Sequence, residues 1–475
     1  MNYQNYVASL IARSRKAQEI AAHYNQEKVE QLIAAIAYGV TQEDFRRKIS
    51  EMLVEECGMG SVEDKIGKML GKVKQVYYQN KDELSCDLVE VNEKTGMSKY
   101  YKPMGVIAAL IPVTNSEVTQ FSKAIMCLKG RNSIIFAPHP KGAKTTVVIT
   151  ERLREILKMY DAPEDLIMTV DPEYVSVDCS GELMKQADFV LATGGTPMVR
   201  AAYSSGTPTI GVGTGNSTTF VDGTTNLDDV ANMIMRSKTF DYATSCSTEN
   251  NIIVLESIHD DFVEALKRQG FYFIPEDSEE KEKLKKGLWP EWPANHKLNR
   301  HIVAQSADKI AEIAGLNAPK GTTVIATEEN GGTGEAFPFS GEKLSPITCL
   351  FTVKDFDGAL DKMENILNYQ GSGHSCGIHS TDDEKIAKMA ERMKVTKMCV
   401  NQPQSLSNSG AWWNGFNKST TLGCATWGHN SISHNVTWKD LVNCTYVSRP
   451  IKNYYEPTME ELFPEAVREV IDKKF

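Results

Sequence analysis

Long hydrophobic runs are missing from this sequence of 475 residues. No apolar stretch approaches the roughly 18 residues that a membrane span requires, so we do not expect a membrane protein. Residues 1–18 also lack the basic head, apolar block and small-residue cleavage site of a secretory signal. We therefore expect the protein to reside in the cytosol.

An excess of positive charge is also missing. The chain has 52 Lys and Arg against 62 Asp and Glu, a formal net charge of -10. A protein that binds nucleic acid in general would carry a basic face, so we do not expect a nucleic-acid partner. The ten cysteines contain no Cys-x-x-Cys pair, which argues against a zinc ribbon and an iron–sulfur cluster. We expect reduced thiols and no metal site.

What the chain does contain predicts an α/β protein of two or three domains. Residues 2–85 have helical spacing of apolar positions. Short apolar runs then alternate with helix-like segments, namely 105–111, 133–137 and 188–192. Such alternation is typical of a parallel, doubly wound sheet. A second α/β domain is predicted from the strand 251–255 and the helix 260–269, and residues 401–435 have the composition of binding loops.

Cys246 lies among small polar residues in the segment 237–250, directly before the apolar run 251–255. A nucleophilic thiol needs an accessible loop, small neighbours and a rigid strand behind it, and this segment offers all three. A cysteine chosen at random is more often buried and inert, so the context must decide. The segment 193–197, with its two glycines between a strand and a helix, predicts a phosphate-binding corner.

Several segments in order along the chain resemble the aldehyde dehydrogenase superfamily. They are 102–115, 128–140, the turn at Gly194 and Gly195, 211–216, Cys246 and 339–346. The resemblance runs from about residue 5 to about residue 450 and is strongest to the branch that transfers the acyl group to coenzyme A. It implies a Rossmann-type cofactor domain over 1–238 with a helical segment over 1–95, a catalytic domain over 239–425, and a β-rich oligomerisation segment over 426–475.

The resemblance also implies roles for individual residues. Cys246 matches the nucleophile, and Asn115 matches the amide that holds the oxyanion of the tetrahedral adduct, an interaction that lowers such barriers. The residues implied for binding a nicotinamide cofactor are Glu342, which matches the ribose-binding glutamate, and Thr193, Gly194, Gly195, Pro138 and His139. NADP is favoured over NAD by the most similar subfamilies, with Lys141 and Lys144 as nearby partners for a 2′-phosphate.

Coenzyme A, rather than water, is expected to accept the acyl group. Hydrolytic relatives carry a glutamate that activates water at the position that aligns with Val212, which offers no base. Water attacks a thioester slowly without a general base, whereas a thiol needs little activation. A hydrolytic aldehyde dehydrogenase is the first alternative, and a non-catalytic member of the fold is the second.

The substrate is expected to be a short anionic aldehyde. Segments such as 58–65, 202–208 and 369–379 resemble acylating sulfoacetaldehyde dehydrogenases most, and 415–435 resembles succinate-semialdehyde dehydrogenases that use coenzyme A. The residues considered for the substrate are His374, Lys418 and Trp413, with Arg131 and Arg200 as further cations. A His374–His379 pair without a carboxylate is more often structural than metal-binding.

A β-rich tail over 438–449 resembles the oligomerisation strand of the superfamily, which predicts a homodimer or homotetramer. The sequence leaves open whether the protein is free in the cytosol or enclosed in a bacterial microcompartment.

Overall fold

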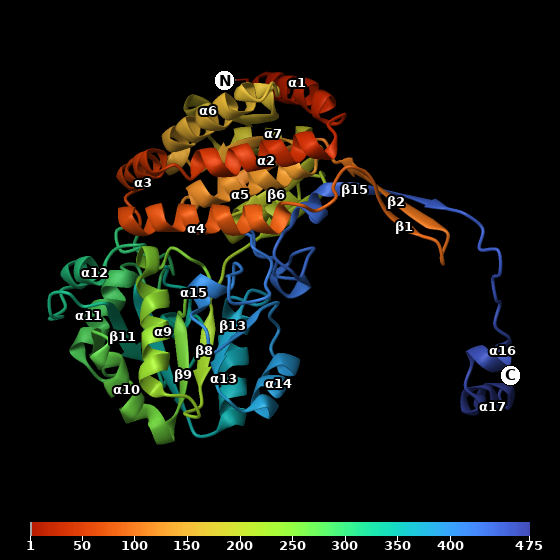
Figure 1. Cartoon of the computed structure of the whole chain (residues 1–475). Coiled ribbons are helices and arrows are strands. Elements are labelled where there is room, and N and C mark those ends of the chain that lie inside the picture. Colours follow the sequence, from red (N-terminus) through yellow and green to blue (C-terminus); the bar gives the residue numbers. More distant parts are fainter. Residues whose placement is uncertain (1) are drawn as a thin grey trace.

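The computed structural model describes residues 2–475 and begins with four helices. These are α1 (Tyr3–Ala21), α2 (Gln26–Val40), α3 (Glu43–Cys57) and α4 (Val62–Asn80). Asn2, Asn25 and Ser61 start three of them, because each side chain accepts a hydrogen bond from a backbone N–H of the first turn. The helices cover the upper part of the molecule in Figure 1.

The first sheet is parallel and has five strands in the order β5-β4-β3-β6-β7. Its strands are β3 (Val106–Ile111), β4 (Ser133–Pro138), β5 (Ile167–Thr169), β6 (Phe189–Thr193) and β7 (Thr209–Val212). Helices α5 (Ser116–Lys129), α6 (Ala143–Met159), α7 (Val177–Gln186) and α8 (Thr196–Tyr203) connect them. All positions of β3 and β4 are buried, as expected of strands covered on both faces. The strand order reverses between β3 and β6, where ligands bind in open α/β sheets.

The second sheet has seven parallel strands in the order β10-β11-β12-β9-β8-β13-β14. Its strands are β8 (Thr218–Val221), β9 (Asn251–Leu255), β10 (Phe271–Ile274), β11 (Val324–Glu328), β12 (Ile347–Val353), β13 (Cys376–His379) and β14 (Met398–Val400). The helices of this part are α9 (Leu227–Thr239), α10 (His259–Arg268), α11 (Glu279–Leu288), α12 (Ala307–Ala314), α13 (Phe356–Tyr369), α14 (Asp383–Arg392) and α15 (Gln404–Ser407).

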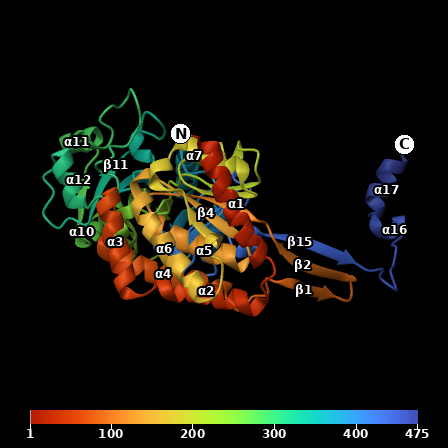
Figure 2. The ribbon, with the colours of Figure 1, turned by 90° about the horizontal axis from the view of Figure 1, so that it is seen from above.

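A third, antiparallel sheet projects from the body. It consists of β1 (Asp87–Asn92), β2 (Met97–Pro103) and β15 (Val442–Ser448), with β15 at one edge. Beyond it, α16 (Met459–Leu462) and α17 (Glu465–Asp472) stand clear of the rest of the chain in both views (Figure 1, Figure 2). Neither helix buries any residue.

The predicted fold class is confirmed, with two differences in detail. The N-terminal helices end at Asn80 and β1 follows, although helical structure was predicted to residue 95. Strand β1 is mostly exposed and so lacks the apolar run that identifies a strand in a sequence. The chain changes sheets between β7 and β8, ahead of the domain boundary predicted at residue 238. No helix in residues 2–475 is long and apolar enough to cross a membrane.

Candidate active site

Cys246 lies in a loop between the short helix η4 (Phe240–Ala243) and strand β9. Eight of the ten cysteines are buried, whereas Cys246 is partly exposed and Cys444 is exposed on the projecting sheet. Three consecutive residues of η4, Asp241, Tyr242 and Ala243, have φ angles of 50°, 49° and 59°. This left-handed conformation is costly for residues with a Cβ, so neighbouring groups must hold it. The loop that presents Cys246 is therefore held under local strain.

A cavity of about 230 Å³ opens beside the Cys246 thiol at the carboxyl ends of β3 and β6. It therefore lies at the point where the order of the first sheet reverses. Seven of the predicted site residues line it: Asn115, His139, Thr193, Gly194, Gly195, Cys246 and Glu342. The structure thus brings residues from both sheets to one place.

The thiol of Cys246 has a histidine partner. The distance from Cys246 Sγ to His374 Nε2 is 3.1 Å, and His374 Nδ1 lies 2.8 Å from the hydroxyl of Ser375. Burial, reinforced by the charge of Lys397, lowers the pKa of His374 to about 3, so the imidazole is neutral and one ring nitrogen can accept a hydrogen bond from the thiol. His374, predicted as a substrate ligand, lies in contact with the nucleophile.

The surroundings of Cys246 are mainly apolar. Val212, Leu422 and Cys424 form a small buried cluster against which Cys246 packs. Burial, assisted by the negative charge of Glu342, raises the pKa of the Cys246 thiol to about 12, and the nearby Lys397 ammonium opposes this shift. Val212, which we expect at the position of the water-activating glutamate of hydrolytic relatives, lines the cavity with an apolar side chain.

Asn115 directly precedes α5, and its amide group reaches the nucleophile loop instead of capping the helix. Its Nδ2 donates to the Thr244 carbonyl at 3.1 Å, and its Oδ1 accepts from Lys68 Nζ at 3.0 Å. Because Lys68 occupies the oxygen, the amide nitrogen is the end turned toward the Cys246 loop. A donor in this orientation can stabilise an oxyanion beside the thiol.

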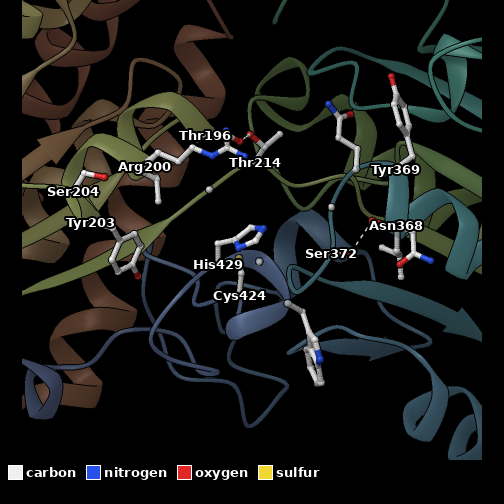
Figure 3. Close-up of a pocket in the computed structure, with 17 residues that line it drawn as sticks. Thr196, Arg200, Tyr203, Ser204, Thr214, Asn368, Tyr369, Ser372, Cys424 and His429 are labelled. Atoms are coloured by element: carbon white, nitrogen blue, oxygen red, sulfur yellow. Dashed lines mark hydrogen bonds between the residues drawn. The ribbon is translucent and has the colours of Figure 1, made fainter.

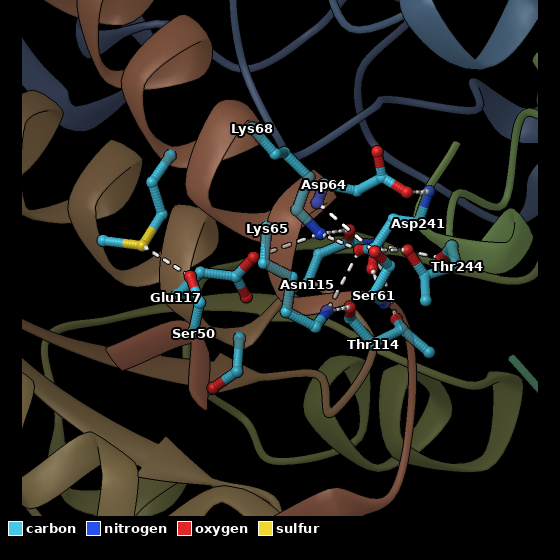
Figure 4. A network of polar contacts seen from close by, with 12 residues as sticks. Ser50, Ser61, Asp64, Lys65, Lys68, Thr114, Asn115, Glu117, Asp241 and Thr244 are labelled. Atoms are coloured by element: carbon cyan, nitrogen blue, oxygen red, sulfur yellow. Dashed lines mark hydrogen bonds and ion pairs between the residues drawn. The ribbon is translucent and has the colours of Figure 1, made fainter. Parts of the chain in front are cut away.

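A buried ionic network supports both Asn115 and the Cys246 loop (Figure 4). Asp241 is fully buried and pairs with Lys65 at 3.0 Å and with Lys68. Lys68 also pairs with the buried Glu117 at 3.1 Å. Burial alone would raise the pKa of Asp241, but the ammonium groups of Lys68 and Lys65 hold it below its usual value. The network ties α4 and α5 to η4, which carries the strained residues.

Glu342 faces the cavity from the segment after the short helix η6 (Pro338–Ser340). Its Oε1 is buried and has no hydrogen-bond partner among residues 2–475. Burial raises the pKa of this carboxyl to about 8, and the nearby charges of Lys238 and Lys343 oppose that effect. A buried acceptor without a partner fits a ligand that brings hydroxyl groups, such as a ribose. The site therefore suits the nicotinamide cofactor that the sequence predicts.

Two glycines in the same cavity also suit a nicotinamide cofactor. Gly194 and Gly195 line the cavity between β6 and α8, and Gly195 is the N-cap residue of α8. Their missing side chains leave the start of this helix open to a phosphate group. Pro138 is buried at the end of β4 and does not line the cavity.

The structure separates the cations that were considered for an anionic substrate. Arg131 is buried, and its guanidinium donates to backbone carbonyls and to Asp87 away from the site. Arg200 lines a different cavity, of about 580 Å³, between α8 and residues 367–372 and 424–429 (Figure 3). Cys246 does not line that cavity. Lys418 lies on the loop before Thr420, a residue of the Cys246 cavity.

Trp413 does not line the Cys246 cavity. Its side chain is 56% exposed, and its indole Nε1 donates to Ser407 Oγ at 3.2 Å.

Three residues near the site were not predicted from the sequence, namely Asp241, Lys68 and Lys397. Lysine and aspartate in a helical or loop segment are usually solvated, so nothing in the sequence singled them out. Lys397 is buried and donates to the Gly423 carbonyl at 2.7 Å.

Comparison with known proteins places the chain in a family. The model of the aldehyde dehydrogenase family matches residues 3–441, so the chain belongs to that family. A sulfoacetaldehyde dehydrogenase of Acholeplasma sp. is 41% identical over 468 residues, which are 98% of this chain and 95% of that protein. A succinate-semialdehyde dehydrogenase (acetylating) of Clostridium kluyveri is 35% identical over 98% of this chain and its full length.

Among solved structures, an acetylating aldehyde dehydrogenase from Geobacillus thermoglucosidasius superposes with a TM-score of 0.90. It is 34% identical, and the match covers 96% of this chain and 98% of that chain. The predicted resemblance to the acylating branch of the superfamily is confirmed by these relatives.

Proposed function

We propose that this chain is a CoA-acylating aldehyde dehydrogenase that oxidises a short anionic aldehyde, with sulfoacetaldehyde as the first candidate. The observation that carries the proposal is the Cys246–His374 contact at 3.1 Å beside a cavity that Cys246, Asn115 and Glu342 line. This combination can form a covalent adduct, hold its oxyanion and accept a ribose in one place. The nature of the relatives supports the acyl transfer and the choice of aldehyde.

In the proposed mechanism, the neutral His374 orients the Cys246 thiol through their contact, and the thiol gives up its proton to solvent as the sulfur bonds to the aldehyde carbon. Asn115 Nδ2 donates a hydrogen bond to the resulting oxyanion. A nicotinamide cofactor bound in this cavity supplies the hydride acceptor. Cys246 then carries the acyl group as a thioester, until the thiol of coenzyme A attacks and the Cys246 thiolate leaves. The aldehyde loses two electrons and one proton is released overall.

Glu342 and the 193–195 turn would hold the cofactor. The free Oε1 of Glu342 would accept hydroxyl hydrogens of the ribose, and the turn before α8 would receive the phosphates. His139 lines the same cavity, and Lys141 and Lys144 are exposed just beyond it. These two lysines support NADP over NAD, because a 2′-phosphate gains from a nearby cation.

Transfer to coenzyme A rather than to water is supported by the apolar wall beside the thiol. Val212, Leu422 and Cys424 surround Cys246 where a water-activating carboxylate would be required. A succinate-semialdehyde dehydrogenase that uses coenzyme A is the second candidate, favoured by the Clostridium kluyveri relative. The two candidates share the chemistry and differ in the length of the aldehyde.

Cofactor reduction at 340 nm tests the proposal. Purified protein is given sulfoacetaldehyde or succinate semialdehyde with NAD or NADP, each with and without coenzyme A. We expect turnover to require coenzyme A, to be faster with sulfoacetaldehyde and NADP, and to vanish in Cys246→Ala. Equal turnover without coenzyme A would mean hydrolysis and would overturn the argument from Val212.

A homo-oligomer in the cytosol is the expected form of this enzyme. Strand β15 is a free sheet edge, and the chain beyond it exposes apolar side chains, among them Val470, which is 66% exposed. An open edge and an exposed apolar helix both favour a second copy as the covering partner. Light scattering of the full chain and of a chain ending at residue 441 tests this, since only the full chain should be dimeric or tetrameric.

A further inference from the structure

One face of α4 carries lysines toward the catalytic cavity. Lys68 and Lys72 are four residues apart, so their side chains lie on the same side of the helix about one turn apart. Lys68 contacts Asn115, which lines the cavity beside Cys246. Lys72 therefore lies one helical turn beyond the oxyanion-binding amide.

Lys72 meets the loop that carries Lys418. Lys72 Nζ donates to the Gly410 carbonyl at 3.1 Å, and Gly410 packs directly against the Cα and Cγ of Lys418. The backbone N–H of Lys418 donates to Gln79, also on α4. Two residues after Lys418, Thr420 lines the cavity of Cys246. Helix α4 and this loop thus place Lys72 and Lys418 close to each other near Asn115 and Thr420, although neither lysine lines the cavity itself.

These two cations lack a carboxylate partner. Lys65 and Lys68 are neutralised by Asp241 and Glu117, whereas no ion pair within residues 2–475 involves Lys72 or Lys418. Burial, together with the like charges of Lys418 and Lys68, lowers the pKa of Lys72 to about 8. Like charges held together without a counter-charge are unfavourable, and an anion between them relieves the repulsion.

Both side chains are also accessible. Lys72 and Lys418 are only partly buried, and the exposed Trp412 and Trp413 flank the loop on the outside. The partial exposure of both residues leaves room for a small anion to reach the pair. By contrast, the ammonium of Lys68 is buried and already occupied by Asp241, Glu117 and Asn115.

We propose that Lys72 and Lys418 form the subsite that binds the anionic end of the substrate. The inference rests on the proposed function and names the residues that select a sulfonate- or carboxylate-bearing aldehyde over a neutral one. With the aldehyde carbon at Cys246 and its oxygen at Asn115, the other end of the substrate points along α4 toward Lys72. The two ammonium groups share the oxygens of the sulfonate or carboxylate by charge-assisted hydrogen bonds.

The test compares charged and neutral aldehydes in matched variants. Lys72→Met and Lys418→Met keep a long side chain and remove the charge, and Lys74→Met makes the same change at an exposed position of α4. The kinetic constants are measured with sulfoacetaldehyde, succinate semialdehyde and propionaldehyde at saturating coenzyme A and cofactor. We expect kcat/KM for the anionic aldehydes to fall about tenfold or more in each subsite variant, mainly through KM.

Propionaldehyde, which carries no charge, distinguishes a loss of anion binding from damage to the rest of the active site. Turnover of propionaldehyde should stay within about twofold of the parent in both subsite variants, and Lys74→Met should match the parent with every substrate. The anionic aldehyde with the larger loss names the preferred anion, sulfonate or carboxylate. Sulfoacetate should inhibit the parent competitively and the two subsite variants much less.

Three results would overturn the subsite. An equal loss with propionaldehyde would show a structural role for the lysines, unchanged kinetics would place the anion elsewhere, and a rise confined to the KM for coenzyme A would assign the lysines to its phosphates. Failure of the proposed function is seen separately, as a parent enzyme that oxidises propionaldehyde without coenzyme A.

Discussion

Replacing Asp241 by asparagine removes the charge at the centre of the network in Figure 4. Asp241 is fully buried, accepts hydrogen bonds from the Ser61 amide at 2.9 Å and the Thr244 hydroxyl at 2.8 Å, and pairs with two lysines. In the variant Lys65 keeps no carboxylate, and Lys68 keeps only Glu117. Leaving a buried charge without its partner costs about 3–5 kcal/mol, so we expect the free energy of unfolding to fall by about that amount.

The same substitution should lower kcat, because Asp241 belongs to the strained turn before Cys246 and Lys68 positions Asn115. Urea unfolding followed by fluorescence gives the stability, and cofactor reduction at 340 nm gives kcat and KM. The control is Asp82→Asn, which removes a carboxylate from the exposed Lys81–Asp82 pair and should change neither quantity appreciably.

The pH dependence gives an independent readout. The pKa of Asp241 is held below its usual value in the folded protein, so its contribution to stability is present at neutral pH and is lost as the pH falls below about 4, through the lowered pKa. The stability difference between parent and Asp241→Asn should therefore shrink in acid. Equal unfolding midpoints and equal kcat at neutral pH would refute the structural role assigned to this network.

Three further predictions concern the nucleophile itself. His374→Gln should lower kcat about tenfold with little change in KM, because it removes the neutral imidazole that orients the thiol at 3.1 Å; full activity would contradict that role. Since burial raises the pKa of Cys246 to about 12, its alkylation by iodoacetamide should accelerate about tenfold per pH unit from about pH 7 to 10, and a plateau near neutral pH would argue against a buried thiol. Gly215→Ala places a Cβ 2.1 Å from the Cys246 carbonyl oxygen, so activity should fall while circular dichroism stays that of the parent; an active variant would show that the loop can move away.

Strands β3, β4 and β6 of the first sheet were predicted because they are mostly buried on both faces, whereas the short edge strands β5 and β7 were not predicted. Runs such as 106–111 contain only apolar residues and are bounded by glycine and proline, which identifies them without tertiary information. The carboxyl ends of β3 and β6 bring Asn115, Thr193, Gly194 and Gly195 to one cavity, at the point where the strand order of a doubly wound sheet reverses. The roles assigned to these residues remain predictions that the kinetic tests address.

Other features depend on contacts between distant parts of the chain. Strand β8 was not predicted because Thr218–Val221 is short and polar at its start, and it becomes a strand through pairing with β9 and β13. Strand β1 is exposed and is stabilised by pairing with β2. Short or exposed strands carry little periodic signal, so their pairing partners define them.

The sequence alone was enough for the fold class, the family and the presence of Cys246, Asn115 and Glu342, because these depend on local patterns and on motifs in a given order. Only the tertiary structure shows which charged residues are buried and which of them pair with one another. Lys65 and Lys68 look like solvated helix residues until Asp241, more than 170 positions away, meets them in the interior. Lys72, Lys418 and the His374–Cys246 contact also join separate segments, and the burial that shifts their pKa values exists only once both sheets have packed together.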